Sequence, residues 1–403
     1  MKKQYALIDK IIEHSIYLFI FFLFLAKGEA IRNILVFGSF ILWALTLKHR
    51  GNLSLLKKQL SILCWIYLGA TVLSVLFSID FQYSLSELKE KPLKFAMLFT
   101  VISTVMADEE KLKKTALVCL ITVVFIVIAG YYSYIFHNIR LLTPNTVLVH
   151  AWHNKFARYV CMLLSFTFIL YFVWRRPVFK SLLVIVLIVS VLALILSTSR
   201  GGYMGFMGIV FVWSLYIART RGYNFKKVLA YILIVFLIVG TFSYLTFPNV
   251  NRRMNNLSKD ILTITERTEL WKAAVHGIKV RPVFGWGYGD NIYRWDEPFE
   301  DTIYEKAPQT EKGVHNIFFR IMFHQGFVGL IPYILIILIA VKDFWKEAFM
   351  TTGVSSYMLV ACVSVLVGNY ILHAMLADVE LIHLAVVLGL GMAAKGIREN
   401  RCT

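Results

Sequence analysis

Charged residues are scarce in this chain. Asp, Glu, Lys and Arg make up 16% of its 403 residues, whereas 58% are hydrophobic. A soluble protein would carry about 25% charged residues, so the scarcity excludes that class. Acidic residues are the scarcer sign: 24 Asp and Glu stand against 42 Lys and Arg, for a formal charge of +18. The basic residues lie mostly in short loops and form no compact domain. This distribution argues against nucleic-acid binding. It is typical of loops that contact membrane lipids at the anionic cytoplasmic leaflet.

Cysteine is also sparse. The five cysteines contain no CxxC pair, which indicates neither a disulfide framework nor a zinc site. No two histidines have the HxxxH or HExxH spacing of a metal site. The sequence therefore predicts no bound metal and no cofactor.

Long apolar runs dominate what is present. A helix of about 20 apolar residues crosses the hydrocarbon layer of a membrane. Twelve such runs lie near 12–27, 31–47, 59–79, 92–107, 115–136, 157–174, 179–197, 202–218, 228–247, 316–341, 353–373 and 380–396. They predict an all-α polytopic membrane protein that forms a single integral membrane domain over 1–403. One large, partly helical loop, 247–315, separates spans nine and ten and is expected to carry part of the active site.

Lys and Arg concentrate in alternate loops. The richer loops include 2–3, 48–58, 111–114, 175–180, 219–227, 342–346 and 395–401. Because cytoplasmic loops carry the excess of basic residues, both termini are expected inside, and the 137–157 loop, the Arg200 turn and the 247–315 loop outside. The outer face has no ATP and no nucleotide-sugars. Chemistry there needs a donor that is already activated, most simply a sugar on a polyprenyl pyrophosphate.

The first part of the large loop predicts a helix. Residues 263–266 resemble a capping box, apolar residues follow at 270, 274 and 278, and Pro282 ends the pattern. Arg267 lies in the first turns, and Trp271 follows one turn later. A helix start with an adjacent Arg can bind phosphate; a surface pair with Glu266 or Glu269 remains the alternative.

Three glycines alternate with aromatic residues in the sequence that follows, at 285, 287 and 289. Their spacing fits neither the Walker nor the dinucleotide pattern. We interpret the segment as a tight turn. Trp286, Tyr288, Tyr293 and Trp295 would then stack on sugars or pack at the membrane interface.

Arg200 begins a predicted helix and follows the hydroxyls of 197–199. Gly201 and Gly205 give that helix a small-residue face for close packing. An Arg at the outer end of a span could reach the headgroups, but the hydroxyls favour anion binding. Lys155 and Arg158 lie in the preceding outer loop and could extend the same site.

His315 begins the span after the large loop, followed by Asn316. An unperturbed imidazole titrates near neutrality, which suits a general base. A structural hydrogen-bonding role is the alternative reading of a lone His.

Taken together, these features resemble the O-antigen ligase family and the related O-antigen polymerases. The resemblance rests on Ser199-Arg200-Gly201-Gly202 opening a span, Arg267-xxx-Trp271 followed by Arg281-Pro282-xx-Gly285-x-Gly287, and His315-Asn316 closing the loop. The motifs cover 197–320, and the topology covers nearly the whole chain.

The resemblance implies a metal-independent, inverting glycosyltransferase at the periplasmic face of a Gram-negative inner membrane. It would transfer O-antigen polysaccharide from undecaprenyl pyrophosphate to the lipid A–core oligosaccharide. By the motifs, Arg200 and Arg267 would bind the pyrophosphate and His315 would deprotonate the acceptor. Additional contacts would come from Trp271 and Asn316, and from a third basic residue.

Arg158, Lys155 and Arg140 compete for that third basic position. Three other functions remain open. An O-antigen polymerase and a protein O-oligosaccharyltransferase would use the same donor. A transporter or flippase would show repeated halves and acidic residues within spans, and neither is evident here.

Overall fold

The computed structural model describes residues 2–25, 28–49, 51–136, 142–146, 149, 151–248, 250–251, 261–289, 314–377 and 379–402. These residues are largely helical and include no β-strand. The α-helices are α1 (Lys2–Phe22), α2 (Glu29–Leu45), α3 (Gln59–Leu76), α4 (Phe81–Glu90), α5 (Pro92–Val105), α6 (Glu109–Phe136), α7 (His153–Val173), α8 (Pro177–Leu196), α9 (Arg200–Arg221), α10 (Phe225–Thr246), α12 (Ile261–Val280), α13 (Ile317–Ala348), α14 (Gly353–Val365) and α15 (Leu381–Cys402).

Four shorter helical segments complete this part of the chain. They are η1 (Leu47–His49), η2 (Gly51–Lys57), the π-helix η6 (Leu366–Leu372) and the 3-10 helix η7 (His373–Met375). The segments η6 and η7 continue α14 toward the start of α15.

The all-α polytopic architecture is confirmed. Each of the twelve predicted spans overlaps a helix. Among the described residues, eight helical segments are long and apolar enough to cross a membrane: α3, α6, α7, α8, α9, α13, the α14–η7 segment and α15. The count of twelve spans therefore stays a prediction, because α2 and α5 are shorter, α1 does not meet the same criteria, and the described apolar stretch of α10, Leu237–Thr246, is also shorter. The amphipathic helix α4 was not predicted.

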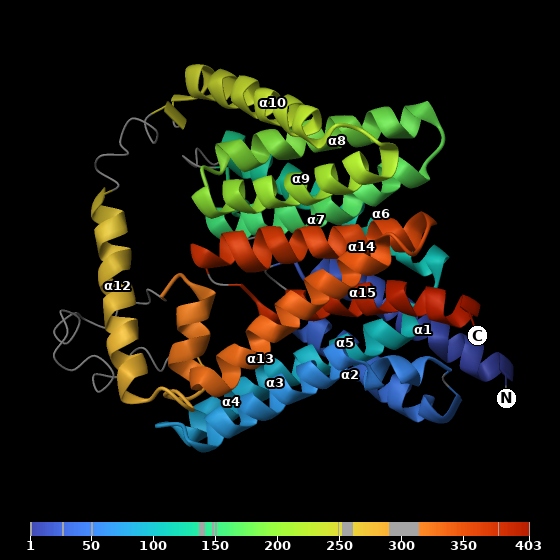
Figure 1. Cartoon of the computed structure of the whole chain (residues 1–403), viewed down its shortest axis with the longest axis vertical. Helices are drawn as coiled ribbons and strands as arrows, with labels where there is room; N and C mark the ends of the chain where they lie inside the picture. The colour runs from blue at the N-terminus through green and yellow to red at the C-terminus, as the bar shows by residue number, and fades with distance from the viewer. Residues whose placement is uncertain are drawn as a thin grey trace.

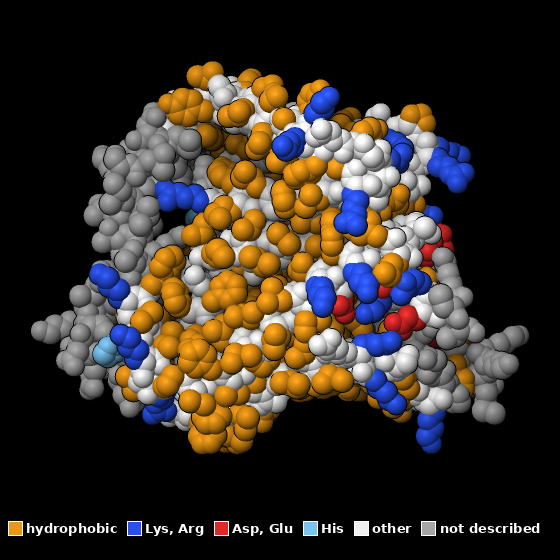
Figure 2. Space-filling view, viewed as in Figure 1, with side chains coloured by type: hydrophobic (Ala, Val, Ile, Leu, Met, Phe, Trp, Pro, Cys, Tyr) orange, Lys and Arg blue, Asp and Glu red, His pale blue; other side chains and the backbone are white. Residues whose placement is uncertain are grey.

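Helix α12 lies across one end of the bundle, at the left in Figure 1, and both termini lie at the opposite end. Apolar side chains cover much of the visible face, and Lys and Arg gather toward the end that carries the termini (Figure 2). This charge distribution agrees with an inside position for the termini.

Among the eight candidate spans, α7, the α14–η7 segment and α15 are the most buried, whereas α8 is mostly exposed. Their side chains join one continuous core that includes Phe156, Val160, Leu359 and Leu388. Both α7 and α15 begin at the end of the bundle that α12 covers (Figure 1). Their first residues are therefore supported by helices that are packed into the core.

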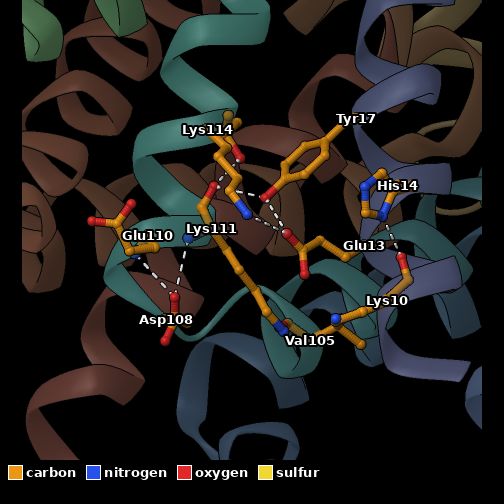
Figure 3. A network of polar contacts seen from close by, with 10 residues as sticks. Lys10, Glu13, His14, Tyr17, Val105, Asp108, Glu110, Lys111 and Lys114 are labelled. Atoms are coloured by element: carbon orange, nitrogen blue, oxygen red, sulfur yellow. Dashed lines mark hydrogen bonds and ion pairs between the residues drawn. The ribbon is translucent and has the colours of Figure 1, made fainter. Parts of the chain in front are cut away.

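A polar network holds α1 against α6 at the end that carries the termini (Figure 3). The hydroxyl of Tyr17 donates to Glu13 Oε1 at 2.9 Å and to the carbonyl of Lys111 at 3.2 Å. Lys114 Nζ lies 3.5 Å from the same Glu13 oxygen. The buried carboxylate of Glu13 is therefore satisfied by a hydroxyl and an ammonium group, as a buried charge requires.

Candidate functional site: a convergence of helix N-termini

Three long-range hydrogen bonds or ion pairs connect this region: they join the starts of α9 and α15 to the start of α7, and the start of α13 to the end of η7. Ser199 Oγ donates to Asn154 Oδ1 at 2.7 Å, which joins α9 to α7. Glu380 pairs with Arg158, which joins α15 to α7. Asn316 Nδ2 donates to the carbonyl of Met375, the last residue of η7. This bond joins α13 to the segment that leads into α15. A helix N-terminus carries about half a positive charge and points N–H groups outward, so the four starts together favour an anion.

Arg200 is held at the first position of α9 by a cap on the residue before it. Ser199 Oγ accepts from the backbone N–H of Gly202 at 3.1 Å. Thr198 has a φ of 53°, a conformation that few non-glycine residues adopt. The predicted helix start is confirmed, and the Arg200 side chain is half-buried there.

The small-residue face of α9 packs as predicted. A Cβ on Gly201 would lie 3.1 Å from the ring of His373, and one on Gly205 would lie 3.2 Å from the carbonyl oxygen of Gly368. A Cβ on Gly368 would in turn meet the carbonyl of Gly205 at 2.4 Å. The start of α9 therefore lies in direct contact with η6 and η7, and little can move between them.

Lys155 and Arg158, two of the three candidates for the third basic contact, share one carboxylate. Lys155 Nζ lies 2.8 Å and Arg158 Nη2 lies 3.2 Å from Glu380 Oε1, while His383 Nδ1 lies 3.2 Å from Glu380 Oε2. The side chains of Arg158 and His383 are buried, whereas those of Lys155 and Glu380 are 43% and 40% exposed. This cluster opens on the Lys155 side. Arg140, the third candidate, lies outside the described residues.

The charge balance of this cluster is positive. Burial raises the pKa of the Glu380 carboxyl, but the combined pull of His383, Arg158 and Lys155 holds that pKa well below its usual range. Glu380 is therefore ionised near neutral pH. One carboxylate then faces two cations, and one positive charge remains.

The π-helix η6 and the residues after it connect the parts of this site. Asn369 Nδ2 donates to the carbonyl of Arg158 at 3.1 Å, and the hydroxyl of Tyr370 donates to the carbonyl of Glu380 at 3.3 Å. Segments of π-helix occur frequently at functional sites. Sequence reasoning missed this role for Asn369, because one Asn in an apolar run has no distinguishing pattern.

His315 and Asn316 begin α13 in the same way that Thr198 and Ser199 begin α9. Asn316 Oδ1 accepts from the backbone N–H groups of Phe318 and Phe319 at 3.0 and 3.2 Å. His315, directly before this cap, has a φ of 51° and a half-buried side chain. The predicted helix start at His315-Asn316 is confirmed, and the cap fixes the direction in which the chain enters it.

Helix α12 contacts the start of α13 through Trp271. Its Nε1 donates to the carbonyl of Val314 at 2.9 Å, and its ring lies 5.8 Å from that of Phe319. The predicted helix in the large loop is confirmed, and it ends at Val280, before Pro282. The backbone position of Arg267 lies on α12 one turn before Trp271. The Trp271 contact therefore brings the segment that carries Arg267 to the His315 end of the bundle.

The glycine segment after α12 packs against α13. Cβ atoms on Gly285, Gly287 and Gly289, all with positive φ, would lie 2.4 Å from the His324 backbone, 1.9 Å from a Ser78 oxygen and 2.5 Å from a Tyr83 carbon, respectively. The three glycines are therefore required by close approach.

This segment also pairs with a break in α13, where Gly326 has a φ of 62° and a ψ of −160°. The backbone N–H of Trp286 donates to Phe323 at 3.0 Å, and that of Phe327 donates to Pro282 at 2.8 Å. Trp286 is buried, with its Nε1 donating to Gly277. Of the two roles considered for Trp286, sugar stacking and interfacial packing, the structure shows neither, because core packing has removed its ring from both surfaces. Tyr293 and Trp295 lie outside the described residues.

Residues 185–334 match the family model described as O-antigen ligase. The match runs from α8 into α13 and includes Arg200, Arg267 and His315, but neither Arg158 nor Glu380. It confirms the predicted resemblance to the O-antigen ligase and polymerase superfamily, and this family implies a glycosyltransferase-type enzyme that uses lipid-linked polysaccharide. No curated protein sequence matches the chain.

Proposed function

We propose that this chain, an enzyme of the O-antigen ligase and polymerase group, is an O-antigen ligase. It transfers O-antigen polysaccharide from undecaprenyl pyrophosphate to the lipid A–core oligosaccharide at the periplasmic face of the inner membrane. The observation that carries the proposal is that the starts of α7, α9 and α15, with their basic residues, are joined by side-chain contacts, while the start of α13, where His315 lies, is bonded to the end of η7. Such a site matches a donor with a pyrophosphate group.

The leaving group sets the electrostatic requirement. When the bond between the anomeric carbon and the phosphate oxygen breaks, negative charge grows on the pyrophosphate. Arg200 and Arg267 bind that group and stabilise the growing charge, with Arg158 or Lys155 as the third cation. Because the helix starts are fixed by Ser199 and Asn316, the cations and helix dipoles need little reorganisation during the reaction.

His315 accepts the proton of the attacking hydroxyl on the acceptor sugar. The oxygen of that hydroxyl forms the new bond on the face opposite the pyrophosphate, which inverts the anomeric configuration. The pyrophosphate is already a good leaving group, so no residue has to protonate it and no metal ion is required. Asn316 and Trp271 act as positioning residues, since both contact the chain next to His315.

The test is complementation of a deletion strain, with lipopolysaccharide analysed on a gel. Core-only lipopolysaccharide together with accumulated lipid-linked polymer in the deletion strain supports a ligase. Core that carries a single repeat supports a polymerase instead, and loss of a glycoprotein with normal lipopolysaccharide supports a protein O-oligosaccharyltransferase.

The site assignment is tested in the same strain with Arg200→Ala, Arg267→Ala and His315→Ala. Matched controls are Arg221→Ala, at the other end of α9, and His276→Ala, at an exposed position of α12. The first three variants should fail to restore long-chain lipopolysaccharide, and the controls should succeed. If His315→Ala complements at a normal membrane level, the general-base assignment is wrong.

A further inference from the structure

Glu380 is a carboxylate inside a site that otherwise favours anions. It lies directly before α15 and offers one oxygen to both Lys155 and Arg158. The donor proposed above would bring phosphate oxygens to the same cations. Carboxylate and phosphate are bound by the same side chains in the same way, so the two anions compete for one position.

We propose that Glu380 is an internal counter-anion: it occupies Lys155 and Arg158 when no donor is bound, and the donor's pyrophosphate displaces it. The inference rests on the proposed function and assigns the same site a residue that neither the family match nor the motifs include. Glu380 acts through the two cations and does not touch the reacting atoms.

The contact has the geometry of a replaceable ion pair. Arg158 Nη2 lies 3.2 Å from one carboxylate oxygen of Glu380, and His383 Nδ1 lies 3.2 Å from the other. A bidentate fork, with two parallel bonds, would hold the carboxylate more tightly. The Glu380 side chain is also 40% exposed, so an anion that arrives from the outer face can reach the pair.

The cations are held independently of Glu380. The backbone of Arg158 accepts from Asn369 at 3.1 Å, and Lys155 and Arg158 both lie in the first two turns of α7, each 5.7 Å from the ring of Tyr159. Removal of the carboxylate therefore leaves both cations in position. The net positive charge of the cluster, which exists even with Glu380 in place, attracts the donor before the exchange occurs.

The exchange also serves product release. Undecaprenyl pyrophosphate remains after transfer, and every cation that stabilised the leaving group would retain it. The return of Glu380 to Lys155 and Arg158 lowers the affinity for that product, because the cations have another partner.

The experiment measures the dissociation constant of inorganic pyrophosphate by calorimetry, with the purified full-length protein in detergent. Glu380→Gln should bind roughly fivefold more tightly than wild type, the factor given by one partly exposed ion pair. Glu90→Gln is the matched control: it removes a carboxylate at the end of α4 that pairs with Lys94 of α5, and it should leave the constant unchanged.

A second variant separates competition from a general structural effect. If Glu380 acts through Lys155, the gain from Glu380→Gln should shrink in a Lys155→Met background, because the contact being relieved is already absent. An equal gain in both backgrounds contradicts the proposal. Weaker or unchanged pyrophosphate binding by Glu380→Gln also overturns it.

Failure of the underlying function has a different signature. If Arg200→Ala binds pyrophosphate as wild type does, or if neither wild type nor Glu380→Gln binds it, the anion site itself is wrong. If Arg200→Ala loses binding while Glu380→Gln gains none, the anion site stands and the role of Glu380 alone is refuted.

Discussion

The junction between α7 and α9 gives the sharpest prediction, since one atom should be enough to disturb it. A Cβ on Gly202 would lie 2.5 Å from the Cβ of Ala157, 3.1 Å from Leu194 Cδ1 and 3.2 Å from Ser199 Oγ. Leu194 can rotate away, but the Cβ of Ala157 moves only with the backbone of α7. Gly202→Ala should therefore push apart the two helices that carry Arg158 and Arg200.

The magnitude follows from a comparison with Gly240→Ala on α10, where the added Cβ would have no atom within 4 Å. Both substitutions gain up to ~1 kcal/mol of helix propensity, so the difference between them isolates the steric cost. Overpacking costs about 1–3 kcal/mol. Gly202→Ala should accordingly unfold at a midpoint several degrees below that of Gly240→Ala, on the scale of about 2–4 °C per kcal/mol.

The same change should weaken pyrophosphate binding at least tenfold, because one charge-assisted contact contributes about 1.5–3 kcal/mol. The assays are thermal unfolding and calorimetry on purified protein in one detergent. Ala157→Gly in the Gly202→Ala background removes the clashing atom and should restore most of the binding. Equal stability of Gly202→Ala and Gly240→Ala, or a double variant no better than the single one, would refute the steric reasoning.

Three further predictions concern the start of α13 and the ion-pair cluster. Asn316→Ala should lose its cap and cost ~1 kcal/mol, whereas Asn316→Asp keeps the accepting oxygen and should unfold near the wild-type temperature. Trp271→Phe keeps an aromatic ring but loses the hydrogen bond to Val314, worth ~1 kcal/mol; long-chain lipopolysaccharide on a gel should decrease at normal membrane levels, and an unchanged gel would exclude a positioning role. Since the folded-state pKa of Glu380 is lowered, its stabilisation is complete above the unfolded pKa of about 4.3 and is lost as pH falls through the folded value. The difference in unfolding temperature between wild type and Glu380→Gln should stay constant from about pH 5 to 8 and shrink only in stronger acid; a change within pH 5 to 8 would contradict this assignment.

Local signals predicted the helix starts well, because their causes are local. The hydroxyls before Arg200, the Asn after His315 and the break before Pro282 each act within a few residues, and each marks a helix boundary in the structure. The helix that carries Trp271 was predicted for the same reason. Periodicity and caps therefore place the individual residues of the site on the correct elements.

Long-range pairs could not be predicted in this way. Glu380 is 222 residues from Arg158 in sequence, and no spacing rule connects them. The sequence pattern of the glycine segment was ambiguous because the segment packs against the break at Gly326. In the sequence, Gly326 lies within one continuous apolar run, and nothing marks a break there. The glycines of the segment are explained only when the backbone of α13 lies against them.

The conformation of His315 shows how such long-range contacts bear on the chemistry. A φ of 51° costs a non-glycine residue about 1–2 kcal/mol, and the surrounding structure has to repay that cost. On one side the carbonyl of Val314 accepts from Trp271 of α12, and on the other the cap of Asn316 holds two backbone N–H groups of α13. The imidazole is thus held by backbone fixed at both neighbours. The position of His315 as a general base therefore depends on the docking of α12. The same helix carries Arg267. Binding of the pyrophosphate and removal of the acceptor's proton are therefore both expected to depend on the docking of α12, to which the contact of Trp271 with the residue before His315 contributes.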